Sequence, residues 1–288
     1  MGVMKNKLNN SHRSLYPTDL TERQWQILRP WFEPELKDSN LGGRPAKYPV
    51  REILNAVLYH TRGGQAWRLL PHDLPPWQSV YGYFRKWGRS GLLERVNDEL
   101  CLRVRTSEDR KEQPTAAIID AQSVKGAQTV GFKSRGYDAG KKINGRKRHL
   151  AVDTIGLLLC VIVSAASVQD RDGAKPLLEN LRDKFPTISL VWADGGYTGK
   201  LLIWAQAQLM LIIAIAKRTE LHSFEVVPRR WVVERTFAWI MLCRRNCRDY
   251  ERLPEVSEAF VTLTMIGLMT RRLARQAAYR KKDWRMVT

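Results

Sequence analysis

The chain has 288 residues, and 44% of them are hydrophobic, which is enough for one large domain or for one domain with a smaller partner. Its 48 Lys and Arg outnumber its 29 Asp and Glu, so the net charge is +19 and nucleic acid is the favoured partner; a solvated basic surface is the alternative. The apolar runs are too short to span a bilayer and the first 13 residues are polar, so we expect a cytoplasmic, nucleoid-associated protein without a membrane contact.

The N-terminal part of the chain predicts a helical unit over residues 18–106, preceded by a flexible polar segment, 1–17. Thr21 is the expected N-cap of a first helix, with Gln24 at the capping-box position. A second helix fits the apolar spacing after residue 50 and ends at Gly63-Gly64. The loop between these helices carries two candidate DNA-binding cations, Arg44 and Lys47.

Residues 66–91 predict a helix-turn-helix, because a short helical stretch and a proline-containing turn precede a second helix. Its polar and basic tips are candidate DNA contacts: Gln78, Ser79, Tyr81, Arg85 and Lys86. The alternative is an all-helical bundle with Trp67, Trp77 and Trp87 in its core. One more helix follows, and the polar residues 107–114 then predict a linker.

After the linker the pattern changes to β β β α β α β α over residues 115–275, followed by a basic tail at 276–288. Three strands in sequence and then alternating strands and helices indicate an α/β mixed sheet with helices on both faces. By comparison, this order resembles the ribonuclease H fold. Asp172 is the expected cap of the first of these helices.

Three carboxylates fall on elements that such a sheet could bring together. Asp120 ends the predicted first strand, Asp194 ends the fourth, and Glu234 lies on the helix after the fifth. The first and fourth strands would lie side by side and parallel, so we expect their carboxyl ends to be neighbours. Taken singly, each residue has a plainer interpretation: a strand-end cap, a turn residue, and a surface ion pair with Arg230 or Arg235.

Three carboxylates in contact would repel one another unless a cation joined them. Oxygen ligands favour two Mg²⁺ ions, with Mn²⁺ as a substitute, and such a pair about 4 Å apart can activate a nucleophile at phosphorus. Further cations surround the three acids in sequence and are candidate phosphate contacts: Lys125, Lys141, Lys142, Arg146, Lys147, Arg148, Arg230, Arg235, Arg244 and Arg245.

Several long motifs in order resemble the DDE transposases of bacterial insertion sequences, in the insertion-sequence-five group. They include IIDAQSVK, GYDAGKKINGRKRHLAVDTIGLLL, VWADGGYTG and RRWVVERTFAWI, and the resemblance covers about residues 18–275. It implies that Asp120, Asp194 and Glu234 form the DDE triad. The related insertion-sequence-four group has a tyrosine, arginine, glutamate, lysine signature; here Arg230 matches, but Val227 and Met241 replace the tyrosine and lysine, and Arg244 or Arg245 is the candidate substitute for the lysine.

The resemblance implies a magnesium-dependent enzyme that binds the terminal inverted repeats of an insertion sequence, cleaves the ends and joins the 3′-hydroxyls to target DNA. Because two ends must be processed together, it also implies a homodimer or larger assembly on double-stranded DNA. Two alternatives stay open: a nuclease of the same fold without strand transfer, and a non-catalytic DNA-binding repressor.

Overall fold

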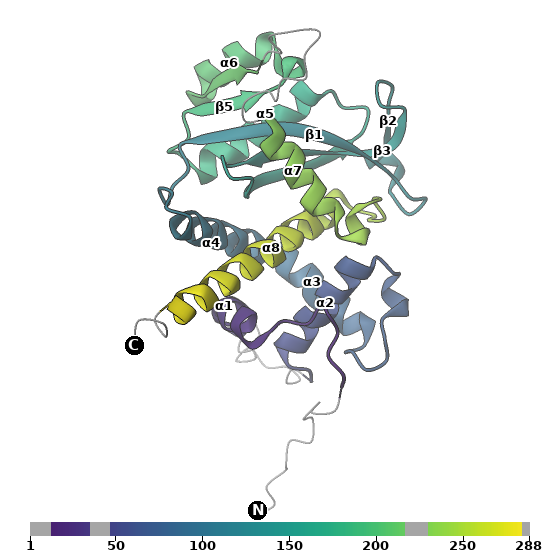
Figure 1. The fold of residues 1–288 in the computed structure, drawn as a ribbon. Coiled ribbons are helices and arrows are strands. Elements are labelled where there is room, and N and C mark those ends of the chain that lie inside the picture. The colour runs from purple at the N-terminus through teal and green to yellow at the C-terminus, as the bar shows by residue number, and fades with distance from the viewer. Residues whose placement is uncertain (1–12, 35–46, 217–229, 284–288) are drawn as a thin grey trace, which may run out of the picture.

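The computed structural model describes residues 13–34, 47–216 and 230–283. Figure 1 shows a mixed sheet with its covering helices above a unit made only of helices. The helical unit contains α1 (Glu22–Phe32), α2 (Val50–Gly63), the short 3-10 turn η3 (Trp67–Leu69), α3 (Trp77–Arg89) and α4 (Leu92–Ser107).

Local signals set the ends of the first two helices. Thr21 caps α1: its hydroxyl accepts from the backbone N–H of Gln24 at 3.3 Å, and the Gln24 side chain accepts from Thr21 N–H at 3.0 Å. The predicted capping box is therefore confirmed. Gly64 ends α2 in the left-handed region, at φ 77°, as the glycine pair predicts.

The segment predicted as a helix-turn-helix has a short first element, because residues 67–69 form only the η3 turn. The full helix that packs against α3 is therefore α2. The tryptophans of this unit contribute to its interior: Trp87 is buried edge-on to Phe32 at 4.9 Å, and Trp67 stacks on His60 at 3.6 Å between ring centres. Val80, Phe84 and Trp87 form the buried side of α3.

The sheet has six described strands in the order β2-β3-β1-β5-β6, and β4 also pairs with β3, next to β2 on the edge opposite β1. Their bounds are β1 (Ala116–Lys125), β2 (Gly136–Asp138), β3 (Ile143–Val152), β4 (Leu158–Ala165), β5 (Leu190–Ala193) and β6 (Ile212–Ile215). β1 and β4 run antiparallel to β3, whereas β5 is parallel to β1 and to β6. The predicted mixed sheet of ribonuclease H type is confirmed; the short β2 was not predicted.

Helices cover both faces of the sheet, and strand alternation decides which residues each face receives. α5 (Asp170–Lys184) and α6 (Lys200–Leu209) lie on one face, where His149 of β3 packs under Gly173. α7 (Arg230–Met241) lies on the other, followed by the η6 turn (Arg244–Asn246), whose Asn246 carbonyl accepts from Arg148. α5 begins at Asp170 with Gln169 as its cap, so the prediction of Asp172 as the cap is wrong.

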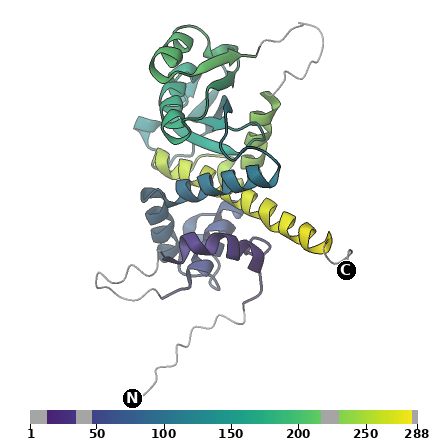
Figure 2. The ribbon, with the colours of Figure 1, turned by 90° about the vertical axis from the view of Figure 1, so that its left-hand side faces the viewer.

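The long helix α8 (Pro254–Asp283) joins the helical unit to the sheet. It packs against α4 and β4 and also contacts α1, α2 and α3, so one continuous apolar core spans both parts. Figure 2 shows α8 and α4 crossing the middle of the molecule between sheet and helices. Within the described ranges, none of the helices combines the length and apolarity that crossing a membrane would require.

Gly173 offers a test of how tightly α5 packs on the sheet. A methyl group there would lie 2.1 Å from a ring carbon of His149, which is buried and hydrogen-bonded to Ser164 at 2.9 Å. We expect Gly173→Ala to lower the free energy of unfolding by about 1–3 kcal/mol through overpacking. Urea denaturation measures this value.

The matched control is Gly82→Ala, because a methyl group at this helical position meets nothing within 4 Å. Helix propensity alone should make that variant more stable by up to about 1 kcal/mol. A Gly173→Ala protein as stable as its Gly82→Ala counterpart would contradict the close packing of α5 on His149.

Candidate active site

Asp120 and Asp194 come from neighbouring parallel strands. β1 and β5 pair from Ala116 with Leu190 to Ile118 with Trp192, and continuing this register by two residues places Asp120 opposite Asp194. Strand alternation puts both carboxylates on the α7 face of the sheet. Both line one small pocket of about 10 Å³, roughly the space for a single water-sized sphere. The structure therefore brings these two predicted residues together.

Asp120 does not end its strand, contrary to the prediction. β1 continues to Lys125 because Asp120 to Lys125 pair with Leu150 to Gly145 of β3. On the other side, the described ladder with β5 stops at Ile118. Asp120 is thus held by β3 along one edge of β1, while the opposite edge opens toward Asp194.

Short-range hydrogen bonds orient both carboxylates. Asp194 caps the turn η5 (Gly195–Tyr197), and its Oδ1 accepts from Gly196 N–H at 2.8 Å. Asp120 Oδ1 accepts from Ala121 N–H at 2.7 Å. The Lys141 ammonium donates to the Ala121 carbonyl at 3.0 Å, which brings a cation to the strand next to Asp120. This polar edge can attract both a cation and a phosphate.

Glu234 lies one turn from the start of α7, the helix that packs on β1 and β3. Val233, Phe237 and Ile240 are buried against the sheet, whereas Glu234 is exposed. Among the described residues, no three His, Cys, Asp or Glu side chains stand close enough to hold a metal ion together. The structure thus gathers Asp120 and Asp194, and places Glu234 on the helix covering the same face without completing a three-carboxylate group.

Comparison with protein families addresses what kind of protein carries these acids. Residues 111–269, more than half of the chain, match the family described as "Transposase DDE domain". The chain belongs to the DDE transposase family. Residues 20–97, most of the helical unit, match a second family described as "Putative transposase of IS4/5 family". The resemblance noted from the sequence motifs is confirmed at the level of the family.

Individual relatives are more distant. A protein of Burkholderia cepacia, described as "Putative transposase for insertion sequence element IS402", is 32% identical over 130 residues, which are 41% of this chain and 60% of the relative. The chain thus spans less than two thirds of that curated relative.

Two solved structures resemble the chain weakly. The Drosophila P element transposase strand transfer complex has a TM-score of 0.32 and 17% identity over 66% of this chain and 46% of that one. The Mos1 mariner paired end complex with Mn has a TM-score of 0.31 and 13% identity over 88% and 87%. These TM-scores are too low to support any inference about this DDE transposase family member.

Two of the predicted DNA contacts are buried in the protein instead. Arg146 is fully buried; its guanidinium donates to Asp249 Oδ1 at 3.2 Å and to the Arg252 carbonyl at 2.9 Å. Arg148 is 1% exposed and donates to the Asn246 carbonyl at 2.8 Å, and burial lowers its pKa. The prediction that these arginines contact DNA is wrong, because their donors are used inside the fold.

Lys147 and Arg245 are likewise buried and paired. The Lys147 ammonium lies 2.8 Å from Asp170 and 3.5 Å from Asp138 on the α5 face. Arg245 binds Glu251 through two guanidinium nitrogens, at 2.8 and 2.5 Å. Both cations are neutralised by carboxylates and have little contact with solvent, so their predicted role in DNA binding is also corrected to a structural one.

Arg235 is half-buried on α7 between two aromatic rings. Its guanidinium carbon lies 4.5 Å from the ring centre of Trp231 and 4.6 Å from that of Trp239, and it donates to the Ile155 carbonyl at 2.9 Å. Burial lowers its pKa. This stack holds α7 against the loop after β3, so Arg235 acts at least partly as a structural residue.

The remaining predicted DNA contacts fall into three groups. Those with exposed side chains are Lys47, Gln78, Lys86, Lys125, Lys141, Lys142 and Arg244. Ser79, Tyr81 and Arg85 on α3 are half-buried. Arg44, Val227 and the side chain of Arg230 lie outside the described residues. Of the two candidate substitutes for the signature lysine, Arg245 is bound to Glu251 and Arg244 is exposed.

Sequence reasoning missed two exposed arginines that share a groove with Arg85 and Lys86. Arg89 continues the helical spacing of those two residues, and this spacing could have indicated it. Arg252 comes from the segment before α8, far away in sequence, and no local signal pointed to it.

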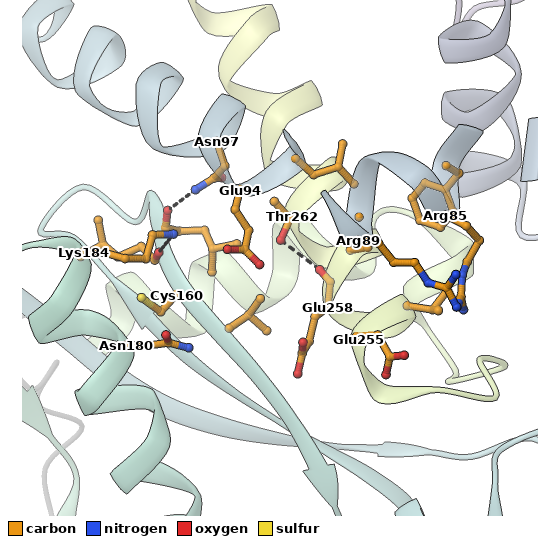
Figure 3. A pocket seen from close by; sticks show the side chains of 18 residues that line it. Arg85, Arg89, Glu94, Asn97, Cys160, Asn180, Lys184, Glu255, Glu258 and Thr262 are labelled. Carbon is orange, nitrogen blue, oxygen red and sulfur yellow. Dashed lines mark hydrogen bonds between the residues drawn. The ribbon is translucent and has the colours of Figure 1, made fainter. Parts of the chain in front are cut away.

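A separate cavity of about 290 Å³ lies at the junction of the helical unit and the sheet, lined by α3, α4, α8, β4 and α5 (Figure 3). Neither Asp120 nor Asp194 lines it. Side chains from the helices secure the β4 edge here: Asn97 donates to the Leu158 carbonyl at 2.8 Å, and Lys184 to that of Leu159 at 3.4 Å. The cavity therefore marks an interface within the protein and is distinct from the carboxylate pair.

Glu258 of α8 lines this cavity and accepts from the Val163 N–H of β4 at 2.8 Å. Its pKa is raised from the ordinary 4.5 to about 7, mainly by burial; Glu94 and Glu255 add to this shift, while the Val163 hydrogen bond and Arg146 oppose it. In the unfolded chain the carboxyl would ionise near 4.5. Its effect on stability is therefore favourable at low pH and is lost as pH rises from about 4.5 through 7.

Glu258→Gln should remove this pH dependence while keeping an oxygen acceptor for Val163. We expect the variant to match the wild type near pH 4.5 and to be roughly 1–3 kcal/mol more stable at pH 8. Denaturant titrations at several pH values measure the difference. Glu179→Gln, at an exposed α5 position that does not line the cavity, is the control and should not change the pH dependence of stability; equal stability of wild type and Glu258→Gln at pH 8 would refute the assignment.

Proposed function

We propose that this chain is a transposase that cleaves the ends of an insertion sequence and joins their 3′-hydroxyls to target DNA, with Asp120, Asp194 and Glu234 as its catalytic carboxylates. The observation that carries the proposal is the placement of Asp120 opposite Asp194 on the α7 face, at one pocket, in a chain with a DDE transposase domain. Glu234 is assigned from its helix and from the family resemblance.

A divalent metal fits the donor set in part. Asp120 and Asp194 supply oxygen ligands at one pocket with room for an ion-sized sphere, which suits Mg²⁺ or Mn²⁺ better than zinc. These two residues would hold it, and Glu234 is assigned as the third ligand from the family resemblance. When bound, the metal would polarise the attacking oxygen and stabilise the leaving oxygen at phosphorus.

The protein's own residues would position the reaction. β3 pairs with β1 along the whole stretch from Asp120 onward, so the backbone that carries the first carboxylate is held beside the pocket. Lys141 and the exposed Lys125 and Lys142 lie near the distal end of β1 and would attract the phosphodiester. Asp194 is oriented by its turn.

Two displacement steps at phosphorus account for the proposed reaction. Water attacks the phosphorus at the element end, the bond from phosphorus to the 3′-oxygen breaks, and the element keeps a 3′-hydroxyl. That hydroxyl then attacks a phosphorus of target DNA and displaces a target 3′-oxygen, so bonds are exchanged without a covalent enzyme intermediate. The α3 face of the helical unit would bind the terminal inverted repeats, and a homodimer or larger assembly would hold both ends.

Alanine substitution tests the carboxylates. Asp120→Ala, Asp194→Ala and Glu234→Ala should each reduce Mg²⁺-dependent end cleavage at least about a hundredfold, because each removes a negatively charged ligand, whereas binding to the ends should change little. Gel assays of cleavage and of binding measure the two properties. Substantial cleavage by any one variant would remove that residue from the proposed triad.

A strand-transfer assay separates this function from its alternatives. With a pre-cut element end, a target plasmid and Mg²⁺, we expect joined product from the wild type and none from Asp194→Ala. Cleavage without joining would point to a nuclease of the same fold. Metal-independent binding without any cleavage would point to a repressor.

A further inference from the structure

A basic groove of about 940 Å³ runs between α3 and the segment 251–256. Its lining includes Arg85, Lys86 and Arg89 from α3, and Arg252 from the opposite wall. Among the described residues, the side chains of Arg85, Arg89 and Arg252 have no hydrogen bond or ion pair within the chain. These guanidinium groups therefore remain available to an external anion.

One carboxylate lines the groove, and the fold already neutralises it. Glu251 is buried and bound by Arg245 at 2.5 Å, and its backbone N–H donates to Asp249 at 2.9 Å. The groove thus presents a net positive surface in which Lys86, Arg89 and Arg252 are exposed, Arg85 is half-buried and the acid is buried. Such a surface would attract a polyanion.

Both walls of the groove are firmly held. Arg146, buried beneath the second wall, donates to the Arg252 carbonyl at 2.9 Å and fixes the backbone there. On the first wall, Phe84 of α3 packs on Phe260 of α8 with ring centres 4.5 Å apart. The spacing of the cations across the groove is therefore set by buried contacts, and little reorganisation is needed to bind a ligand.

Gly82 lies among these cations on the exposed side of α3. A Cβ there would meet no protein atom within 4 Å, so packing does not require glycine at this position. Glycine also weakens an exposed helix interior relative to most other residues. Close approach of a ligand to the helix backbone gives a reason for a glycine at this point.

We infer that this groove binds the sugar–phosphate backbone of duplex DNA, with Arg85, Lys86, Arg89 and Arg252 as the phosphate contacts. The arginine and lysine side chains at helical spacing can bind successive phosphates. The neighbouring glycine has no side chain, so the DNA backbone can pass close to the helix. The inference rests on the proposed function, which supplies DNA as the partner, and adds that the helical unit and the segment leading into α8 hold the same duplex.

One variant from each wall tests the groove. Arg89→Gln and Arg252→Gln should weaken binding severalfold, by the same factor for element-end DNA and for an unrelated duplex of equal length, because phosphates carry no sequence. Each should also lower the slope of log Kd against log salt concentration by about 0.9. Fluorescence anisotropy between 50 and 200 mM salt, without divalent metal, measures both.

Arg103→Gln is the matched control, since Arg103 is an exposed helical arginine on α4 that does not line the groove. It should leave affinity and slope unchanged. Wild-type affinity and slope for both groove variants, or equal losses in the control, would overturn the inference. If the groove bound an acidic protein instead of DNA, both groove variants would keep wild-type DNA affinity and salt slope, and this outcome would also overturn the inference.

Gly82 gives a second, independent test. Gly82→Gln adds a neutral side chain and Gly82→Glu a charged one of almost the same size, at an exposed position where a Cβ meets no protein atom within 4 Å. Both should fold, as circular dichroism would check, and both should weaken DNA binding, with the larger loss for glutamate. Unchanged binding by Gly82→Glu would exclude a phosphate near α3.

These outcomes are separable from failure of the proposed function. Weakened binding by the groove variants, in a protein that never cleaves DNA, would support the groove and refute the transposase reaction. Normal binding by those variants, in a protein that cleaves and joins ends, would refute the groove alone.

Discussion

The pairing of β1 determines the rest of the candidate site. Hydrogen bonds to β3 continue through Lys125, whereas the ladder to β5 covers only Ala116 to Ile118. On the edge of β1 that faces β5, the described ladder therefore ends before Asp120. Asp194 lies opposite this point, directly after the end of β5. Two carboxylates far apart in sequence are thereby held at one pocket by backbone geometry, and neither depends on a flexible loop for its position.

Only part of the positive charge of the chain is at its surface. Part of it lies inside the protein, where Arg146, Arg148 and Arg245 bind carbonyls and carboxylates of the segment between α7 and α8. Buried cations of this kind require partners on every side, so they fix that segment rather than attract DNA. A net charge alone therefore overstates the surface available to nucleic acid.

Local signals predicted the helices and most strands, because caps and apolar spacing act within a few residues. Thr21 with Gln24, and the apolar positions of α1, needed no distant partner. The end of β1 was missed because polar Gln122 and Ser123 extend the strand only through pairing with β3. The burial of Arg146 could not be predicted either, since two of its acceptors, Asp249 and the Arg252 carbonyl, lie about a hundred residues later. At the site, the meeting of Asp120 and Asp194 followed from strand order, but the position of Glu234 depends on how α7 approaches the strands.

The place of α8 has a consequence for how the polypeptide is made. Phe84 and Trp67 of the N-terminal helices pack around Phe260, which the ribosome adds only after the entire sheet has been translated. Until then those aromatic side chains lack their covering helix. The N-terminal helices should therefore reach their final packing late in synthesis, so a nascent, incomplete polypeptide would lack the finished groove between α3 and the segment before α8.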